Sequence, residues 1–197
     1  MRLILVRHPK YVEDMTDRCI GQTNALAIPV STHLVTTLFR QIGWIVTAVV
    51  TSDLLRAAQF AKQIASVFER PLYEDHRLRE ISMGRWENRT WGEIEAEYPT
   101  QLEAWFSDFV NVRPPEGESF VELRTRVRSW LQDLDRTGVY VVVTHAGVIR
   151  TIACEALNIP LENAFRIAPQ HLSLTVLEQT SEGTLRLACI SPGSATS

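Results

Sequence analysis

The sequence has few cysteines and no long apolar run, and both absences exclude classes of protein. The 197 residues include three cysteines without a CxxC spacing, which favours neither a disulfide framework nor a zinc site. No apolar run approaches the roughly 20 residues that span a bilayer, and the N-terminus lacks the pattern of a signal peptide. A formal net charge of −3 argues against nucleic-acid or anionic-membrane binding. We therefore expect a cytoplasmic protein with reduced thiols and with neither a membrane nor a nucleic-acid partner.

The length and composition predict one globular domain. The chain has 197 residues, of which 45% are hydrophobic and 22% charged, as in an average soluble domain. Between residues 77 and 118 the periodicity weakens, and three of the five tryptophans, Trp86, Trp91 and Trp105, lie there. We expect a single domain over residues 1–197, in which residues 77–118 form an insertion that covers the sheet as a lid.

Strand and helix patterns alternate along the chain and predict an α/β fold with a parallel sheet. Ser52 or Asp53 is expected to cap the second helix, and Ser119 to cap a later one. The last two strands look like a closing hairpin, whose edge offers a surface for a homodimer. The predicted strands cover residues 3–6, 46–50, 72–74, 139–144, 172–177 and 185–190, and the predicted helices cover residues 32–42, 54–69, 91–98, 99–109, 119–135 and 147–157.

Two of the buried strands end in a histidine. Residues 3–6 lead to Arg7 and His8, and residues 139–144 lead to His145, after which a helix begins. Open α/β sheets bind ligands beyond the carboxyl ends of their strands, and the start of a helix favours an anion. The arrangement therefore predicts one site for an anionic group.

Arg56 and Glu80 extend this set. Arg56 lies in the first turn of a predicted helix, where the helix dipole disfavours it unless an anion such as Asp53 or a ligand compensates. Each residue taken alone also suits a structural role, as a hydrogen-bonded histidine, an ion-paired arginine or a solvated glutamate. Together they fit phosphoryl transfer, in which arginines bind the phosphoryl oxygens, an imidazole attacks phosphorus, and a carboxyl exchanges protons with the leaving oxygen and water. No residue cluster suits Mg²⁺ or Zn²⁺, so we predict a reaction without a metal or other cofactor.

At this point the sequence resembles the histidine phosphatase (phosphoglycerate mutase-like) superfamily. Leu5–His8 is similar to the family's first-histidine signature, and Thr51–Ala57 is similar to the segment of its second arginine. Leu78–Glu87 resembles the segment with the proton donor, and Val143–Gly147 resembles the second-histidine motif. The motifs follow the family's order from one end of the chain to the other. The resemblance implies a three-layer α/β/α sandwich with a mostly parallel central sheet.

The resemblance also implies a role for each residue. His8 is expected to be the nucleophile and Glu80 the acid/base, with His145 as the third catalytic residue. The phosphoryl group is expected to bind Arg7, Arg56, His145 and Ala146.

Within the superfamily, the sequence is most similar to alpha-ribazole phosphatases of cobalamin biosynthesis. The similar segments are Cys19–Thr23, Gly84–Trp91 and Pro115–Ser119. The first of these lies in a long polar loop, residues 10–24, and loops of that length are usually functional or disordered. The substrate contacts that we expect from this similarity are Gly21, Gln22, Thr23 and Trp86, with Trp91 and Trp105 as further rings for stacking on an aromatic base.

Three residues depart from the family pattern. Pro9 stands where the family usually has glycine, which removes a backbone N–H next to the nucleophile. Lys10 stands where many members have glutamate, and Asp14 where many have an asparagine that contacts phosphate. We expect the chemistry to survive these changes and the substrate preference to differ.

The leading functional hypothesis is hydrolysis of a small phosphorylated metabolite through a phosphohistidine, with alpha-ribazole 5′-phosphate as the candidate substrate. One alternative is a phosphoglycerate mutase or a broad-specificity sugar phosphatase, which would use the same motifs. Another is a non-catalytic sensor of phosphorylated ligands, against which the intact His8, Glu80 and His145 argue.

Overall fold

A six-stranded sheet forms the centre of the molecule. The structure is a computed structural model, and it describes residues 1–40 and 42–191. The strand order is β4-β3-β6-β1-β7-β8. Strands β1, β3, β4 and β6 are parallel, β7 is antiparallel to β1, and β8 is antiparallel to β7. The strands are β1 (Arg2–Arg7), β3 (Ala48–Thr51), β4 (Leu72–Glu74), β6 (Val139–Thr144), β7 (Leu174–Gln179) and β8 (Leu185–Ser191).

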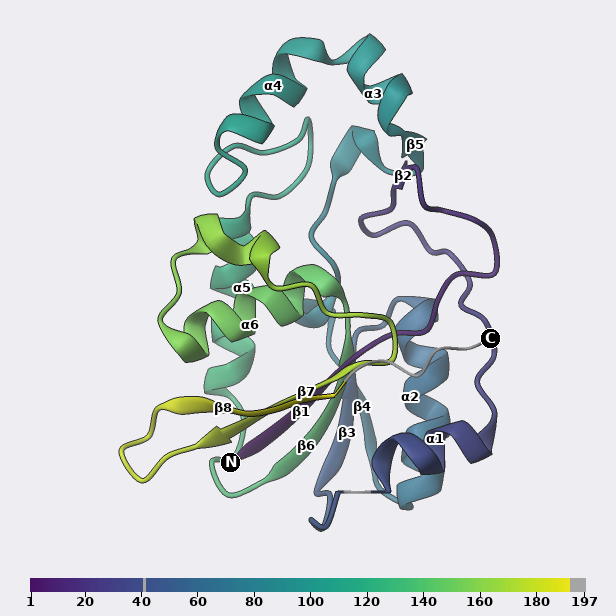
Figure 1. Cartoon of the computed structure of the whole chain (residues 1–197), viewed down its shortest axis with the longest axis vertical. Coiled ribbons are helices and arrows are strands. Elements are labelled where there is room, and N and C mark those ends of the chain that lie inside the picture. Colours follow the sequence, from purple (N-terminus) through teal and green to yellow (C-terminus); the bar gives the residue numbers. More distant parts are fainter. Residues whose placement is uncertain (41, 192–197) are drawn as a thin grey trace.

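Helices cover both faces of this sheet (Figure 1). Side chains along β1 alternate between the two faces, as in any strand. Leu3 and Leu5 belong to the core on the side of α5 and α6, whereas Ile4 and Val6 pack on the side of α1 and α2. The predicted α/β fold with a mostly parallel central sheet is thereby confirmed. The helices are α1 (Thr32–Phe39), α2 (Leu55–Phe68), α5 (Phe120–Gln132) and α6 (Ala146–Leu157).

The segment from residue 77 to 118 lies beyond one end of the sheet, at the opposite end of the molecule from the N-terminus (Figure 1). Two short helices there, α3 (Trp91–Glu97) and α4 (Pro99–Ser107), have clear local causes. A reciprocal capping box between Thr90 and Glu93 begins α3, and Pro99 occupies the first turn of α4. The same part of the chain contains η1 (His76–Leu78), η2 (Gly84–Trp86) and β5 (Arg89–Thr90), which pairs with β2 (Arg18–Cys19).

Several local predictions need correction. Neither Ser52 nor Asp53 caps α2, whose N-cap residue is Leu54. The Asp53 carboxylate accepts hydrogen bonds from Arg79, and Ser52 Oγ accepts one from the Leu54 N–H at 3.2 Å. The first helix ends at Phe39, three residues before the predicted boundary at 42. Cys19, in the polar loop of residues 10–24, is buried.

The described residues include no helix that is both long enough and apolar enough to cross a bilayer.

Candidate active site

The pairing of two parallel strands brings the two histidines together. Arg7 and Thr144 are paired at the carboxyl ends of β1 and β6, and the His8 N–H donates to the Thr144 carbonyl at 3.0 Å. Since His8 and His145 each follow directly on these strand ends, their rings lie with centroids 5.1 Å apart. Both side chains are buried, with exposed fractions of 1% and 0%.

The hydrogen bond of His8 determines which ring nitrogen is free. Its Nδ1 lies 2.7 Å from the Pro9 carbonyl oxygen, which can only accept, so Nδ1 carries the proton of the neutral ring. Nε2 then has a free lone pair. Burial, and after it the nearby Arg56 guanidinium, holds the pKa of His8 well below the ordinary value of 6.5. His8 is therefore neutral near pH 7, with its nucleophilic nitrogen unprotonated.

His145 has the opposite tautomer. Its Nδ1 accepts a hydrogen bond of 3.2 Å from Nε of Arg56, which can only donate, so the neutral ring carries its proton on Nε2. Burial and Arg56 again hold the pKa well below its usual range. The first turn of α2 supplies Arg56, whose other nitrogens donate to the Gly21 and Thr23 carbonyls at 2.6 Å each. The guanidinium thus joins the 21–23 loop to the second histidine.

Two buried hydrogen-bond donors in this site have no partner among the described residues. They are Nε2 of His145 and Nε of Arg7, whose Nη1 donates to the Pro169 carbonyl at 2.8 Å. Buried polar groups nearly always form hydrogen bonds, because an unpaired one loses its hydration without compensation. One cationic and one neutral donor left unpaired beside a neutral imidazole predict an anionic ligand there.

Glu80 closes the site from the side of α6. Its carboxylate accepts from the Gly147 N–H, at 3.0 and 3.2 Å to the two oxygens, and from the Ile81 N–H at 3.0 Å. The contact at the first turn of α6 is favourable because that end of a helix attracts negative charge. The backbone of Glu80 is held as well, since its carbonyl accepts from Gln22 Nε2 and from Arg126 Nη2, both at 3.0 Å.

A cavity of about 910 Å³ adjoins these groups, between the sheet edge and the segment 77–118. Arg7 and Glu80 line it, whereas His8 does not. The Tyr11 and His171 rings both line the cavity and pack on the His8 ring at centroid distances of 5.3 and 5.1 Å. The cavity wall further includes Ala146, Gly147 and Arg150 of α6, and the apolar side chains Ile81, Met83, Trp91, Trp105, Phe120 and Phe165.

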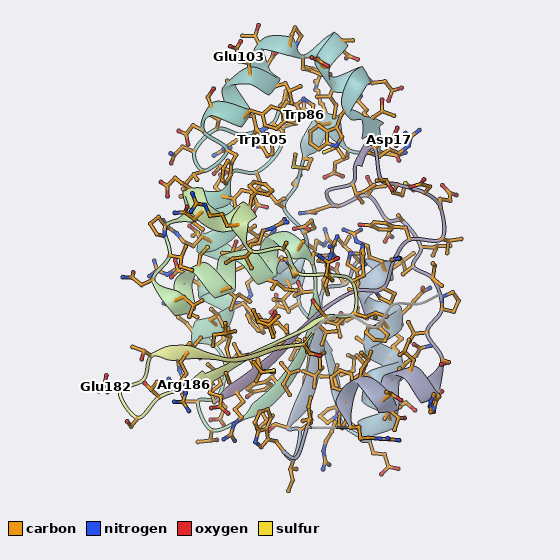
Figure 2. All side chains as sticks on the ribbon, viewed as in Figure 1. Asp17, Trp86, Glu103, Trp105, Glu182 and Arg186 are labelled. Carbon is orange, nitrogen blue, oxygen red and sulfur yellow. The ribbon has the colours of Figure 1, made fainter. Side chains whose placement is uncertain are left out.

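The structure places Trp86, which we predicted to contact substrate, in the core and not in the cavity wall. Its side chain is fully buried, and its ring packs edge-on against Trp105 at a centroid distance of 5.9 Å. In the view of Figure 2 both labelled residues lie below the two short helices α3 and α4. An interior indole cannot stack on a ligand, so Trp86 belongs to the core. Trp91 and Trp105 do line the cavity.

The three loop residues that we expected to contact substrate have different surroundings. Gly21 lines the cavity. Gln22 instead holds neighbouring backbone, because its side chain donates to the Glu80 carbonyl and its N–H donates to Glu87 Oε1 at 3.0 Å. Thr23 accepts from Arg56 through its carbonyl.

The departures from the family pattern also have a structural context. Pro9 has no N–H to donate, but its carbonyl accepts a hydrogen bond from His8 Nδ1. Asp14 is exposed and accepts hydrogen bonds from the backbone and hydroxyl of Thr16, which lower the pKa of its carboxyl. Lys10 lines the cavity. Within residues 1–40 and 42–191, no three His, Cys, Asp or Glu side chains cluster in a way that would hold a metal ion.

Comparison with known proteins decides the family. The sequence profile of the histidine phosphatase superfamily (branch 1) matches residues 3–189. The chain belongs to this superfamily. It is also 31% identical over 185 residues to the Yersinia enterocolitica protein named "Probable phosphoglycerate mutase GpmB", an alignment that covers 89% of this chain and 83% of that protein.

Solved structures of this superfamily fold share the architecture. The alpha-ribazole phosphatase from Shigella flexneri superposes with a TM-score of 0.82 over 100% of both chains, at 21% identity. The mycobacterial glucosyl-3-phosphoglycerate phosphatase superposes with a TM-score of 0.82 over 98% of this chain and 99% of that one, at 24% identity. At identities this low, the superpositions establish the common fold alone.

Sequence reasoning missed Tyr11, Arg150 and His171. Tyr11 follows His8 closely, so its proximity was a usable signal. His171 precedes β7, and its Nδ1 donates to the His8 carbonyl at 2.8 Å only because β7 pairs with β1. A pairing between strands so distant in the chain produces no recognisable pattern in the sequence around residue 171.

Proposed function

We propose that this member of the superfamily is a metal-independent phosphomonoesterase that forms a phosphohistidine on His8. The observation that carries the proposal is the pair of unpartnered buried donors, Arg7 Nε and His145 Nε2, beside the unprotonated Nε2 of a neutral His8. A phosphoryl group between them would accept both hydrogen bonds and face the nucleophile.

The proposed reaction has two displacements at phosphorus. His8 Nε2 attacks, an N–P bond forms, and the bond from phosphorus to the ester oxygen breaks, while Glu80 gives its proton to the departing oxygen. Glu80 then removes a proton from water, whose oxygen attacks phosphorus and breaks the N–P bond. Inorganic phosphate and neutral His8 result. Arg7, Arg56, His145 and the Ala146 N–H are assigned to the phosphoryl oxygens in both steps.

The cover over His8 bears on how substrate enters. Tyr11 and His171 pack on the His8 ring and both line the cavity, so we propose that substrate approaches His8 past these two side chains. We propose that residues 1–197 form one domain and that residues 77–118 act as the lid of the cavity. The cytoplasmic location remains a prediction from the sequence.

Two kinds of leaving group are candidates. The partly exposed Trp91 and the Phe165 ring, 46% exposed, favour an aromatic group such as the base of alpha-ribazole 5′-phosphate, which would place the enzyme in cobalamin biosynthesis. The similarity to a protein named as a phosphoglycerate mutase favours a phosphorylated hydroxy acid or sugar instead.

The decisive experiment measures phosphate release in EDTA from alpha-ribazole 5′-phosphate, sugar phosphates, 3-phosphoglycerate and p-nitrophenyl phosphate. We expect turnover by the wild type and a loss of turnover of at least about 1,000-fold in His8→Asn. When the phosphoryl group of the substrate carries ³²P, the wild-type protein should retain the label after quenching without acid. Glu80→Gln should slow alkyl esters far more than p-nitrophenyl phosphate, whose leaving group needs no proton.

Other outcomes would replace the proposal. Conversion of 3-phosphoglycerate to its 2-isomer without phosphate release would indicate a mutase. Binding of phosphate esters with no turnover of any of them would indicate a sensor.

A further inference from the structure

Arg150 is a half-buried cation in the cavity wall, and the mechanism above does not use it. Within the described part of the chain it has no carboxylate partner, and its only hydrogen bond runs from Nε to the Ile167 carbonyl at 2.9 Å. The Nη groups, which carry four of the five guanidinium N–H bonds, form no hydrogen bond with a described residue. A guanidinium in that condition is a ready binding group for an anion.

The surroundings hold this guanidinium in place. Its carbon lies 4.8 Å above the centre of the Phe165 ring, a cation–π geometry, and the Ile167 carbonyl fixes the Nε edge. The remaining edge, with both Nη groups, is the one that matches an oxyanion in a two-pronged contact. Burial lowers the pKa of Arg150 and the charge of Glu80 raises it, so a bound anion would further favour the charged guanidinium.

The helix places Arg150 away from the proposed phosphoryl site. Ala146 and Arg150 are four residues apart on α6, so they share one face of the helix, and both line the cavity. Four residues of helix rise about 6 Å. A ligand whose phosphoryl group sits at the first turn of α6 would therefore extend along the cavity toward Arg150.

Other cations of the cavity serve this purpose less well. His171 is largely neutral at pH 7, because burial lowers its pKa to about 4. Lys10 is exposed, and Arg18 donates from Nη1 to the Asn88 carbonyl. Arg7 is already assigned to the phosphoryl group.

We infer that Arg150 binds a second oxyanion, a carboxylate or a second phosphate, on the leaving group of the substrate. The substrate class is then a phosphomonoester with a further negative charge, which alpha-ribazole 5′-phosphate does not have. This inference rests on the proposed phosphatase function. Of the two candidates above it selects the phosphorylated hydroxy acid or sugar, and it adds that a sugar substrate would carry a second phosphate.

Matched substrate pairs test the inference. 3-Phosphoglycerate and glycerol 3-phosphate differ by a carboxylate in place of a hydroxymethyl group, and fructose 1,6-bisphosphate and fructose 6-phosphate differ by a second phosphate. For each pair we would measure the ratio of kcat/KM values by phosphate release. The pair that matches the natural ligand should show a preference of about 10-fold or more for the anionic member, as expected for one charge-assisted contact.

Substitutions connect the preference to this side chain. Arg150→Gln should abolish the preference. Arg150→Lys should retain part of it, because lysine keeps the positive charge but cannot form the bidentate contact of a guanidinium. Arg166→Gln is the matched control, since Arg166 is exposed, lies one residue after Phe165 and does not line the cavity. It should keep the preference.

The outcomes separate the inference from the proposed function. An equal rate for both members of each pair, or a preference that survives Arg150→Gln, would overturn the second-anion site while leaving the phosphatase intact. An equal loss on both members would also overturn it and assign Arg150 to the phosphoryl group. Turnover of glycerol 3-phosphate or fructose 6-phosphate that depends on His8 would support the phosphatase function independently of the second-anion site.

Discussion

Lowering the pH from about 7.5 to about 5.5 should destabilise the protein through three buried histidines. The pKa values of His8 and His145 lie well below 6.5, and that of His171 is about 4, with burial as the largest cause in each case. In the unfolded chain each ring takes up a proton as the pH falls through about 6.5. The folded chain does not, so the unfolded state gains stability as the pH decreases.

The size of the effect follows from linkage. A group that titrates only in the unfolded state near pH 6.5 favours unfolding by about 1.4 kcal/mol at pH 5.5 and by less than about 0.1 kcal/mol at pH 7.5. Three such groups together give a loss of about 4 kcal/mol. This is a large part of the roughly 5–15 kcal/mol that stabilises an ordinary domain.

Urea unfolding followed by tryptophan fluorescence at several pH values measures this loss. His145→Gln should reduce the loss of stability by about a third, because the variant lacks one of the three histidines that take up a proton on unfolding. His33→Gln is the control, since the His33 side chain is exposed in the folded protein, and it should leave the loss unchanged. A loss below about 1 kcal/mol, or an undiminished loss in His145→Gln, would refute the assignment of these rings as buried and neutral.

Two substitutions test the packing of the site. Gly147→Ala should lower kcat at least about 10-fold, because the new Cβ would lie 2.3 Å from Glu80 Oε1 and displace the carboxyl. Gly43→Ala should keep wild-type kinetics, because no atom of the described residues lies within 4 Å of its Cβ. Equal kinetics of both variants would contradict the assigned place of Glu80. Trp86→Ala should lower the free energy of unfolding by about 3–5 kcal/mol through a cavity in the core. Its KM, measured where the variant is folded, should stay near that of the wild type, and a large rise in KM would restore Trp86 as a substrate contact.

Local sequence patterns were sufficient for the framework of the site. The apolar runs before His8 and His145 predicted two buried strands with their polar ends at one sheet edge, and the structure pairs Arg7 with Thr144 at that edge. Short β4 has its predicted bounds, and the helix after Ser119 begins with a reciprocal capping box between Ser119 and Glu122. These features depend on residues close in the chain, so periodicity and capping residues reveal them.

The direction and surroundings of each side chain were decided only by the tertiary structure. Trp86 and Trp91 are five residues apart in one segment, yet the first ring is fully buried and the second lines the cavity. Asp53, a plausible helix cap by its position, pairs with Arg79, which is distant in sequence. The sequence alone determined which residue types reach the carboxyl edge of the sheet, because alternation and helical period are local properties. Which of them face the ligand depends on long-range packing that excludes water from some side chains and leaves others beside the cavity.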